Sequence, residues 1–207
     1  MIENLKAGDL VCDFVGGAVG HRFRFGGGRG QALPKAVGMK KGQTPTIVDA
    51  TAGLGGDAFL LASLGAEVTL IERSPEMHRL LQEGLKRALE AGGEVAEVIG
   101  RMTLLFGDAK DVLASLKPKP DVVLVDPMHP PRKKSALVKS EMRQIRQIVG
   151  TDVDAADLMK VALVTAQKRV VLKWPRLADP IASIGPCSHQ IIGKSTRYDV
   201  FMVDLLK

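Results

Sequence analysis

VDATAGLGGDAF, residues 48–59, runs from a β-branched segment through a glycine-rich turn into an apolar segment. β-Branched residues favour a strand, and the glycines permit a tight turn before a helix begins. In open α/β sheets, ligands bind outside the carboxyl ends of the strands. The stretch therefore predicts one strand–turn–helix unit of such a sheet, with a ligand site at the turn.

The chain repeats this unit on the carboxyl side of the glycine turn. From residue 46 onward, short β-branched runs alternate with longer amphipathic ones, the pattern of a parallel sheet with helices on both faces. Ser74 followed by Pro75 predicts the start of one of the helices. The predicted strands are residues 46–50, 67–72, 102–106, 121–125, 169–173, 189–193 and 199–205.

The last two predicted strands are joined only by residues 194–198. This connection is too short for a crossover helix, so the two strands should be antiparallel. The sequence therefore predicts an α/β fold with a mostly parallel seven-stranded sheet and a C-terminal antiparallel hairpin. That outline resembles the Rossmann-like fold of class I methyltransferases, although a fold alone assigns no function.

Composition and segment pattern limit the class of protein. We expect residues 46–207 to form one domain and residues 1–45 to be a glycine-rich extension packed on it. No run approaches the ~18 apolar residues of a membrane helix, which predicts a cytoplasmic protein with no membrane partner. Cys12 and Cys187 lie far apart without metal-like spacing, so we expect idle thiols and no metal site.

Positive charge is concentrated in two segments. The net charge of +6 leans only mildly toward polyanionic partners. Residues 21–30 read HRFRFGGGRG, and residues 127–149 contain the single acid Glu141 among many basic residues. The candidate residues for contacting a polyanion such as RNA are His21, Arg22, Arg24, Arg29, Arg132, Lys133, Lys134 and Lys139.

Two cofactors compete for the glycine turn. Residues 53–58, GLGGDA, satisfy the loose G-x-G-x-x-G/A pattern of dinucleotide-binding enzymes. A pyrophosphate needs the bare positive end of a helix, but Asp57 occupies the first turn and Asp49 ends the strand. Further acids follow the later strands, namely Glu72, Asp108 and Asp126. Such an acidic rim suits the sulfonium cation of S-adenosylmethionine better than NAD.

The positions of these residues suggest their roles. Gly53 and Gly55 would let the backbone approach the ligand, because a side chain there would occupy the ligand's volume. Glu72 would accept hydrogen bonds from ribose hydroxyls, and Asp108 with Ala109 would face the adenine. The acids also have structural interpretations, since a strand-end acid is often solvated and two of them are good helix N-caps, Asp57 and Asp108.

The stretch DPMHPPRKKSALVK, residues 126–139, places one acid, three prolines and a basic run after a strand. An acid and a carbonyl from a rigid turn can accept both N–H bonds of an exocyclic base amine and aim its lone pair. Asp126 would accept, Pro127 would fix the turn, and the basic run would hold phosphates. The alternative is a turn that merely ends the strand, followed by a solvated cationic helix face.

Four stretches together resemble the ribosomal RNA small subunit methyltransferase J family, namely VDATAGLGGDAF, LIERSP, DPMHPPRKKSALVKSEMR and FVGGAVGHRFRFGGGRG. The resemblance implies a bacterial cytoplasmic enzyme that methylates the N2 amine of a guanosine in small-subunit (16S) ribosomal RNA or the small ribosomal subunit. It places the S-adenosylmethionine contacts at Gly56, Asp57, Glu72, Arg73, Asp108, Ala109 and Asp126.

The chain departs from that family in two places. His129 stands where the family usually has an aromatic residue, the platform on which an extruded guanine would stack. Imidazole stacks less broadly, and His129 could also act as a general base. Family members also tend to carry a further N-terminal segment before FVGG.

Two other functions compete with this interpretation. A dehydrogenase would use the glycine turn for NAD, and binding measurements with both cofactors would separate the two enzymes. A non-catalytic RNA-binding protein would use only the basic segments, but it would have no need of Asp126 with its prolines.

Overall fold

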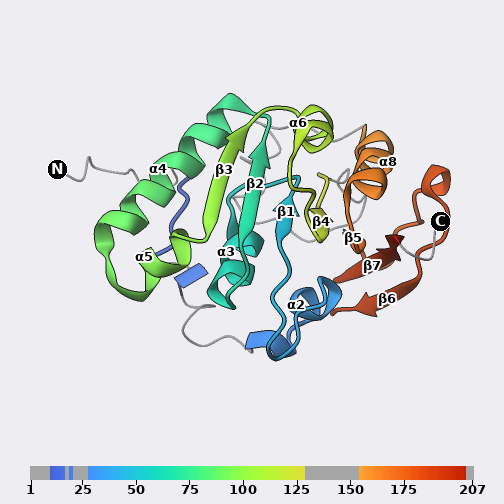
Figure 1. Cartoon of the computed structure of the whole chain (residues 1–207), viewed down its shortest axis with the longest axis horizontal. Helices are drawn as coiled ribbons and strands as arrows, with labels where there is room; N and C mark the ends of the chain where they lie inside the picture. Colours follow the sequence, from blue (N-terminus) through green and yellow to red (C-terminus); the bar gives the residue numbers. More distant parts are fainter. Residues whose placement is uncertain (1–9, 17–18, 21–27, 129–153, 204–207) are drawn as a thin grey trace.

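The computed structural model describes residues 10–16, 19–20, 28–128 and 154–203. Within them, seven strands form one sheet in the order β3-β2-β1-β4-β5-β7-β6 (Figure 1). The strands are β1 (Ile47–Asp49), β2 (Val68–Glu72), β3 (Met102–Phe106), β4 (Val122–Val125), β5 (Arg169–Pro175), β6 (His189–Ile192) and β7 (Thr196–Met202).

The pairing of the strands confirms the predicted sheet. β1 pairs in parallel with β2 and β4, β2 pairs with β3, and β4 pairs with β5. β7 is antiparallel to both β5 and β6. The carboxyl ends of β1 to β5 therefore lie along one edge of the sheet, where a ligand site is expected.

The predicted start of the last strand was wrong. β7 begins at Thr196, three residues before the predicted start at Asp199, and the hairpin turn is residues 193–195. The polar sequence Thr196-Arg197 reads as a turn, but Arg197 is buried and pairs with Asp199, with Nε 2.9 Å from Oδ1. A buried ion pair within the strand is the reason the strand extends further than its polarity suggests.

Helices cover both faces of the sheet, as the alternating pattern predicted. The apolar side chains of β4 alternate between two buried clusters, one with Val122 and Leu124 and one with Val123 and Val125. The first cluster includes side chains of α3 (Gly56–Ser63), α4 (Pro75–Ala91) and α5 (Gly93–Ile99). The second includes those of α6 (Ala109–Ser115) and α8 (Ala155–Thr165).

Local sequence signals explain where helices begin. α4 begins at Pro75, and the Ser74 hydroxyl accepts a hydrogen bond from the Met77 amide at 3.4 Å, which confirms the predicted start. α6 begins after Asp108, whose carboxylate accepts from the Lys110 amide at 2.9 Å. Asp108 is therefore a helix N-cap as well as a strand-end acid.

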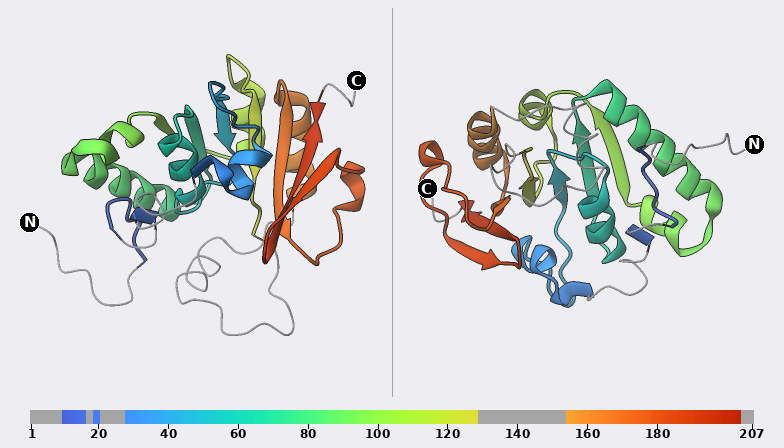
Figure 2. Two further views of the ribbon diagram at one scale, coloured as in Figure 1. Left: turned by 90° about the horizontal axis from the view of Figure 1, so that it is seen from below. Right: turned by 180° about the vertical axis from the view of Figure 1, so that it is seen from behind.

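Part of the N-terminal region belongs to the first cluster. Phe14 and Leu33 are fully buried there, and the Phe14 ring stacks on Phe59 of α3 with centroids 5.2 Å apart. The short helix α2 (Ala32–Ala36) follows the 3-10 turn η1 (Gly28–Gly30) and packs against β6 and β7 (Figure 2). The division of the chain at residue 45 stays a prediction.

The described residues also contain a second 3-10 turn, η2 (Ala182–Ile184), which lies between β5 and β6. None of the helices in the described ranges has the length and apolar character needed to span a bilayer.

Candidate functional site

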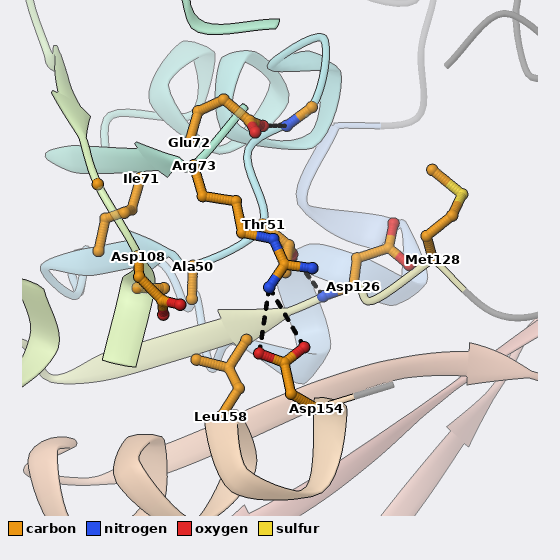
Figure 3. Close-up of a pocket in the computed structure, with 13 residues that line it drawn as sticks. Ala50, Thr51, Ile71, Glu72, Arg73, Asp108, Asp126, Met128, Asp154 and Leu158 are labelled. Atoms are coloured by element: carbon orange, nitrogen blue, oxygen red, sulfur yellow. Dashed lines mark hydrogen bonds and ion pairs between the residues drawn. The ribbon is translucent and has the colours of Figure 1, made fainter. Parts of the chain in front are cut away.

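A pocket opens at the carboxyl ends of β1 to β4 (Figure 3). Apolar side chains form part of its wall, and carboxylates and backbone of strand-end loops form the rest. Its lining residues are Ala50, Thr51, Gly53, Ile71, Glu72, Arg73, Gly107, Asp108, Ala109, Asp126, Met128, Asp154 and Leu158. The structure thus brings together Gly53, Glu72, Arg73, Asp108, Ala109 and Asp126 from the residues that the sequence proposed.

The two predicted contact glycines lie in different environments. Both have left-handed backbones, with φ of 54° at Gly53 and 71° at Gly55. A Cβ on Gly53 would have only the Thr51 carbonyl oxygen nearby, at 3.9 Å, so this glycine opens the pocket. A Cβ on Gly55 would lie 2.9 Å from Leu81 Cδ1 and 3.1 Å from Phe14 Cζ. Packing and backbone conformation are therefore enough to require this glycine, and the ligand-approach role predicted for it stays a prediction.

Gly56 and Asp57 are also outside the pocket lining. A Cβ on Gly56 would approach Val19 Cγ2 at 3.7 Å. Asp57 lies in the first turn of α3, as predicted, but the N-cap of that helix is Gly55. The Asp57 carboxylate instead forms an ion pair with Lys173 of β5, with Nζ 2.7 Å from Oδ2.

Glu72 connects the end of β2 to the glycine turn. Its side chain is buried, and its Oε2 accepts a hydrogen bond from the Gly53 amide at 3.0 Å. Its Oε1 accepts from the Ser74 amide at 2.8 Å. Burial raises the pKa of Glu72, and these backbone donors oppose that rise. The carboxylate is thus fixed at the pocket wall before any ligand arrives.

Asp49 lies beneath the pocket and does not line it. It is buried, and its Oδ1 accepts a hydrogen bond from the Thr51 amide at 3.1 Å. Burial, with the nearby charges of Asp57 and Asp126, raises the pKa of Asp49 to about 7. A direct cofactor contact by this residue stays a prediction.

Asp126 stands at the pocket rim, where β4 ends. Its backbone amide donates to the Thr51 hydroxyl at 2.7 Å, and its Oδ2 lies 2.6 Å from Lys173 Nζ. Pro127, which follows it, is buried. Lys173 was absent from the residues proposed from the sequence. It lies beside Asp126 because β4 pairs with β5 with Val125 opposite Leu172, a contact between distant segments that the sequence does not show.

A second ion-pair group crosses the pocket from β2 to α8. The Arg73 guanidinium reaches Asp154, with Nη1 3.1 Å from Oδ2 (Figure 3). Lys110 Nζ lies 2.7 Å from the same oxygen. The hydrogen bond from Lys110 lowers the pKa of Asp154, and Arg73 lowers it further. Asp154 was not predicted, because no predicted strand ends near it in the sequence and it could not be identified as a strand-end acid.

The pocket rim is less negatively charged than the sequence predicted. Acids do gather at the strand ends, but two ion-pair groups partly neutralise them, through Arg73, Lys110 and Lys173. Among the residues that the structure describes, no group of three or more potential ligands is arranged to hold a metal ion. Burial raises the pKa of the Cys12 thiol to about 12, so this cysteine is an unreactive core residue.

Most of the predicted RNA-binding residues lie outside the described residues: His21, Arg22, Arg24, Arg132, Lys133, Lys134 and Lys139. The predicted stacking residue His129 lies outside them as well. Arg29 is described and exposed, and its guanidinium donates to the Leu64 carbonyl at 2.8 Å. Leu64 follows the end of α3 that is remote from the glycine turn, so an RNA contact by Arg29 stays a prediction.

Comparison with known proteins agrees with this geometry. The SAM_MT family model of SAM-dependent methyltransferases matches residues 1–203. "Ribosomal RNA small subunit methyltransferase J" of Brucella anthropi is 68% identical over 202 residues, which are 98% of each chain. The protein of the same name from Agrobacterium fabrum is 68% identical over 194 residues, 94% of this chain and 92% of that one.

Solved structures support the same assignment. The SAM-dependent methyltransferase NGO1261 from Neisseria gonorrhoeae has a TM-score of 0.75 and 36% identity, covering 98% of this chain and 77% of that one. The rRNA methyltransferase aviRa from Streptomyces viridochromogenes has a TM-score of 0.54 and 16% identity, covering 98% and 94%, and this likeness concerns the fold alone. These sequence matches show that the chain belongs to the ribosomal RNA small subunit methyltransferase J family.

Proposed function

We propose that this protein transfers a methyl group from S-adenosylmethionine to the exocyclic N2 amine of a guanosine in small-subunit ribosomal RNA. Family membership supports the reaction type and the class of RNA. The single observation that carries the proposal is the position of Asp126, which follows β4 at the pocket rim and precedes the buried Pro127. From this position a carboxylate can present the target amine to a ligand in the pocket.

The pocket suits S-adenosylmethionine. Open space beside Gly53 leaves room for the ligand along the glycine turn, and the fixed Glu72 carboxylate can accept from ribose hydroxyls. Asp108 and Ala109 lie where they would face the adenine, between the apolar side chains of Ile71 and Leu158. The bound cofactor supplies an electrophilic methyl carbon on a sulfonium, and the carboxylates favour that cation.

Asp126 would act by orientation. The lone pair of an exocyclic base amine is delocalised into the ring, so the nitrogen must be turned before it can attack. A carboxylate that accepts one N–H, with a carbonyl of the proline turn accepting the other, aims the lone pair toward the pocket. The hydrogen bond from the Asp126 amide to Thr51 keeps the turn in register with β1.

The dehydrogenase alternative loses its physical basis at the same turn. NAD needs a helix N-terminus free to receive a pyrophosphate. The first turn of α3 instead carries Asp57, whose Oδ2 lies 2.7 Å from Lys173 Nζ. The family model that matches the chain is likewise one of methyltransferases.

The substrate partner would be ribosomal RNA or the small ribosomal subunit, in the bacterial cytoplasm. The basic residues 132–139 follow the proline turn in sequence, so phosphate contacts there would place the RNA next to Asp126. His129 would then supply a platform for the extruded guanine. These RNA contacts rest on the sequence.

Methyl transfer to RNA from a strain that lacks this gene tests the proposal. Purified protein and S-adenosylmethionine are incubated with free small-subunit RNA or intact small subunits, and the nucleosides are analysed by mass spectrometry. We expect N2-methylguanosine to appear. Asp126→Ala should lower the single-turnover rate constant by about 10²-fold, the usual loss when a preorganised partner of the transition state is removed.

Asp126→Asn separates the two contributions of the carboxylate. Its amide oxygen still accepts a hydrogen bond, but the charge is gone, so an intermediate rate would mean that both contribute. If Asp126→Ala reacts at the wild-type rate with saturating cofactor and RNA, the proline turn only ends the strand. If the RNA is bound but no methylguanosine forms with the wild-type protein, the non-catalytic RNA-binding alternative is preferred.

A further inference from the structure

Lys173 is a charged side chain in an otherwise apolar part of β5. Its neighbours Val171 and Leu172 are fully buried, and only a quarter of the lysine side chain is exposed. Its Nζ lies 2.7 Å from Asp57 Oδ2 and 2.6 Å from Asp126 Oδ2. One ammonium therefore joins three elements: the first turn of α3, the end of β4 and β5.

Sheet packing does not explain this lysine. Removing an ammonium from water costs several kcal/mol unless the ion is paired and hydrogen-bonded, and an apolar side chain would fill the same place in the sheet. The cost is offset here by two carboxylates, which raise the pKa of Lys173 against the effect of its burial. What the lysine provides is a fixed positive charge beside Asp126.

Three carboxyl groups face this charge from separate elements. They are Asp49 at the end of β1, Asp57 on α3 and Asp126 after β4. Without a cation among them, their mutual repulsion and partial burial would favour protonation. On the other side of the pocket, the charges of Arg73 and Lys110 face Asp154 and Asp108.

We propose that Lys173 is a positioning residue for methyl transfer, which holds the Asp126 carboxylate ionised and in one orientation toward the target amine. The inference rests on the proposed function, since it assigns a partner to the carboxylate that orients the amine. Thr51 fixes the backbone of Asp126 through the 2.7 Å bond to its amide, and Lys173 fixes the side chain. The Asp57 carboxylate in turn keeps the lysine in place.

Lys173→Met tests the inference, because it keeps the length of the side chain and removes the charge. The first readout needs no activity: carboxyl-carbon NMR follows the titration of Asp126, which is assigned by comparison with Asp126→Asn. We expect the substitution to raise the midpoint of the Asp126 titration by about 1 to 3 pH units, the effect of losing an adjacent opposite charge.

The second readout is the single-turnover rate constant at saturating S-adenosylmethionine and RNA. We expect Lys173→Met to lower it by about 10-fold at about pH 5–6, where the raised midpoint leaves Asp126 mostly protonated, and to recover part of the loss at higher pH, where Asp126 ionises again. Lys173→Arg keeps the charge, so its rate should fall less and its acid limb should stay near that of the wild type.

Lys168→Met is the matched control. Lys168 also pairs with an aspartate, with Nζ 2.9 Å from Asp121 Oδ1, but it precedes β5 at the opposite edge of the sheet. Its removal should leave both the Asp126 titration and the rate unchanged. Melting temperatures of all variants identify any general loss of folding.

The outcomes separate this inference from the function on which it rests. An unchanged Asp126 titration in folded Lys173→Met overturns the role of the lysine while leaving the methyltransferase assignment intact. A rate loss that is the same at every pH also overturns it, because the lysine would then have only a structural role. A wild-type protein that methylates no RNA would overturn both proposals.

Discussion

The Glu72 carboxylate accepts hydrogen bonds from two backbone amides, one in the glycine turn and one just after β2. It is 3.0 Å from the Gly53 amide and 2.8 Å from the Ser74 amide, so it holds the glycine turn against the end of β2. Glu72 was proposed as a ribose ligand from its position at the end of a strand. Its carboxylate therefore also stabilises the loop at the glycine turn. The two roles would act together, because the loop is preorganised by the same oxygens that are proposed to accept from the ribose hydroxyls.

Glu72→Ala should weaken S-adenosylmethionine binding by about 1–3 kcal/mol, the cost of leaving partners of a charged hydrogen bond unsatisfied. Isothermal titration calorimetry measures the change. Glu76→Ala is the control, since Glu76 is an exposed acid in the first turn of α4. Equal affinities of Glu72→Ala and the wild type would remove Glu72 from the cofactor site.

Strand-end acids were predictable from the sequence, and their partners were not. The acids end or follow short apolar, β-branched runs, so these runs and the edge rule for parallel sheets locate them. Lys173 reaches Asp57 and Asp126 through strand register, and Asp154 reaches Arg73 and Lys110 through the placement of α8. Both are contacts between distant segments. Gly55 matched a ligand motif, and the structure adds a reason that the sequence does not show, because a Cβ there would approach Leu81 and Phe14.

The last strand, β7, depends on one buried ion pair. Arg197 Nε lies 2.9 Å and 3.1 Å from the two oxygens of Asp199, and its Nη1 donates to three carbonyls at and just after the end of β5. These carbonyls belong to Pro175, Arg176 and Ala178. The guanidinium therefore fixes the loop that leaves β5 as well as the strand itself.

Arg197→Met should lower the free energy of unfolding by about 3–5 kcal/mol, because it leaves Asp199 buried without its counter-charge. Denaturant unfolding measures the loss, and Asp199→Leu in the same chain should recover part of it. The exposed pair of Arg79 with Glu83, at 2.7 Å, is the control. Arg79→Ala should cost less than about 1 kcal/mol, and a similar loss for both variants would refute the role of burial.

Stability of the folded chain should depend on pH through Asp49. Its pKa is about 7 in the fold, above its ordinary value of 3.8, so the folded state binds the proton more tightly than the unfolded chain does. Stability from this group is present at acid pH and falls as the pH rises toward about 7. The cause is burial beside two other carboxylates, the environment that the cofactor site imposes.

Asp49→Asn should remove that dependence, because the amide oxygen can still accept from Thr51 without a charge. From pH 5 to pH 8, the free energy of unfolding of the wild type should fall by about 1–4 kcal/mol more than that of the variant. Urea unfolding at both pH values gives the difference. A gain that is the same at both would mean that Asp49 is ionised in the fold throughout this range.

The place of β7 between β5 and β6 has a consequence for how the protein is made. The ribosome synthesises β5 and β6 before β7, yet β6 has β7 as its partner in the sheet and does not pair with β5. A nascent chain that ends before Thr196 therefore presents β5, the strand that carries Lys173, as an open edge, the kind of edge that invites aggregation. Strand β5, and Lys173 with it, gains its second neighbour in the sheet only when β7 is translated.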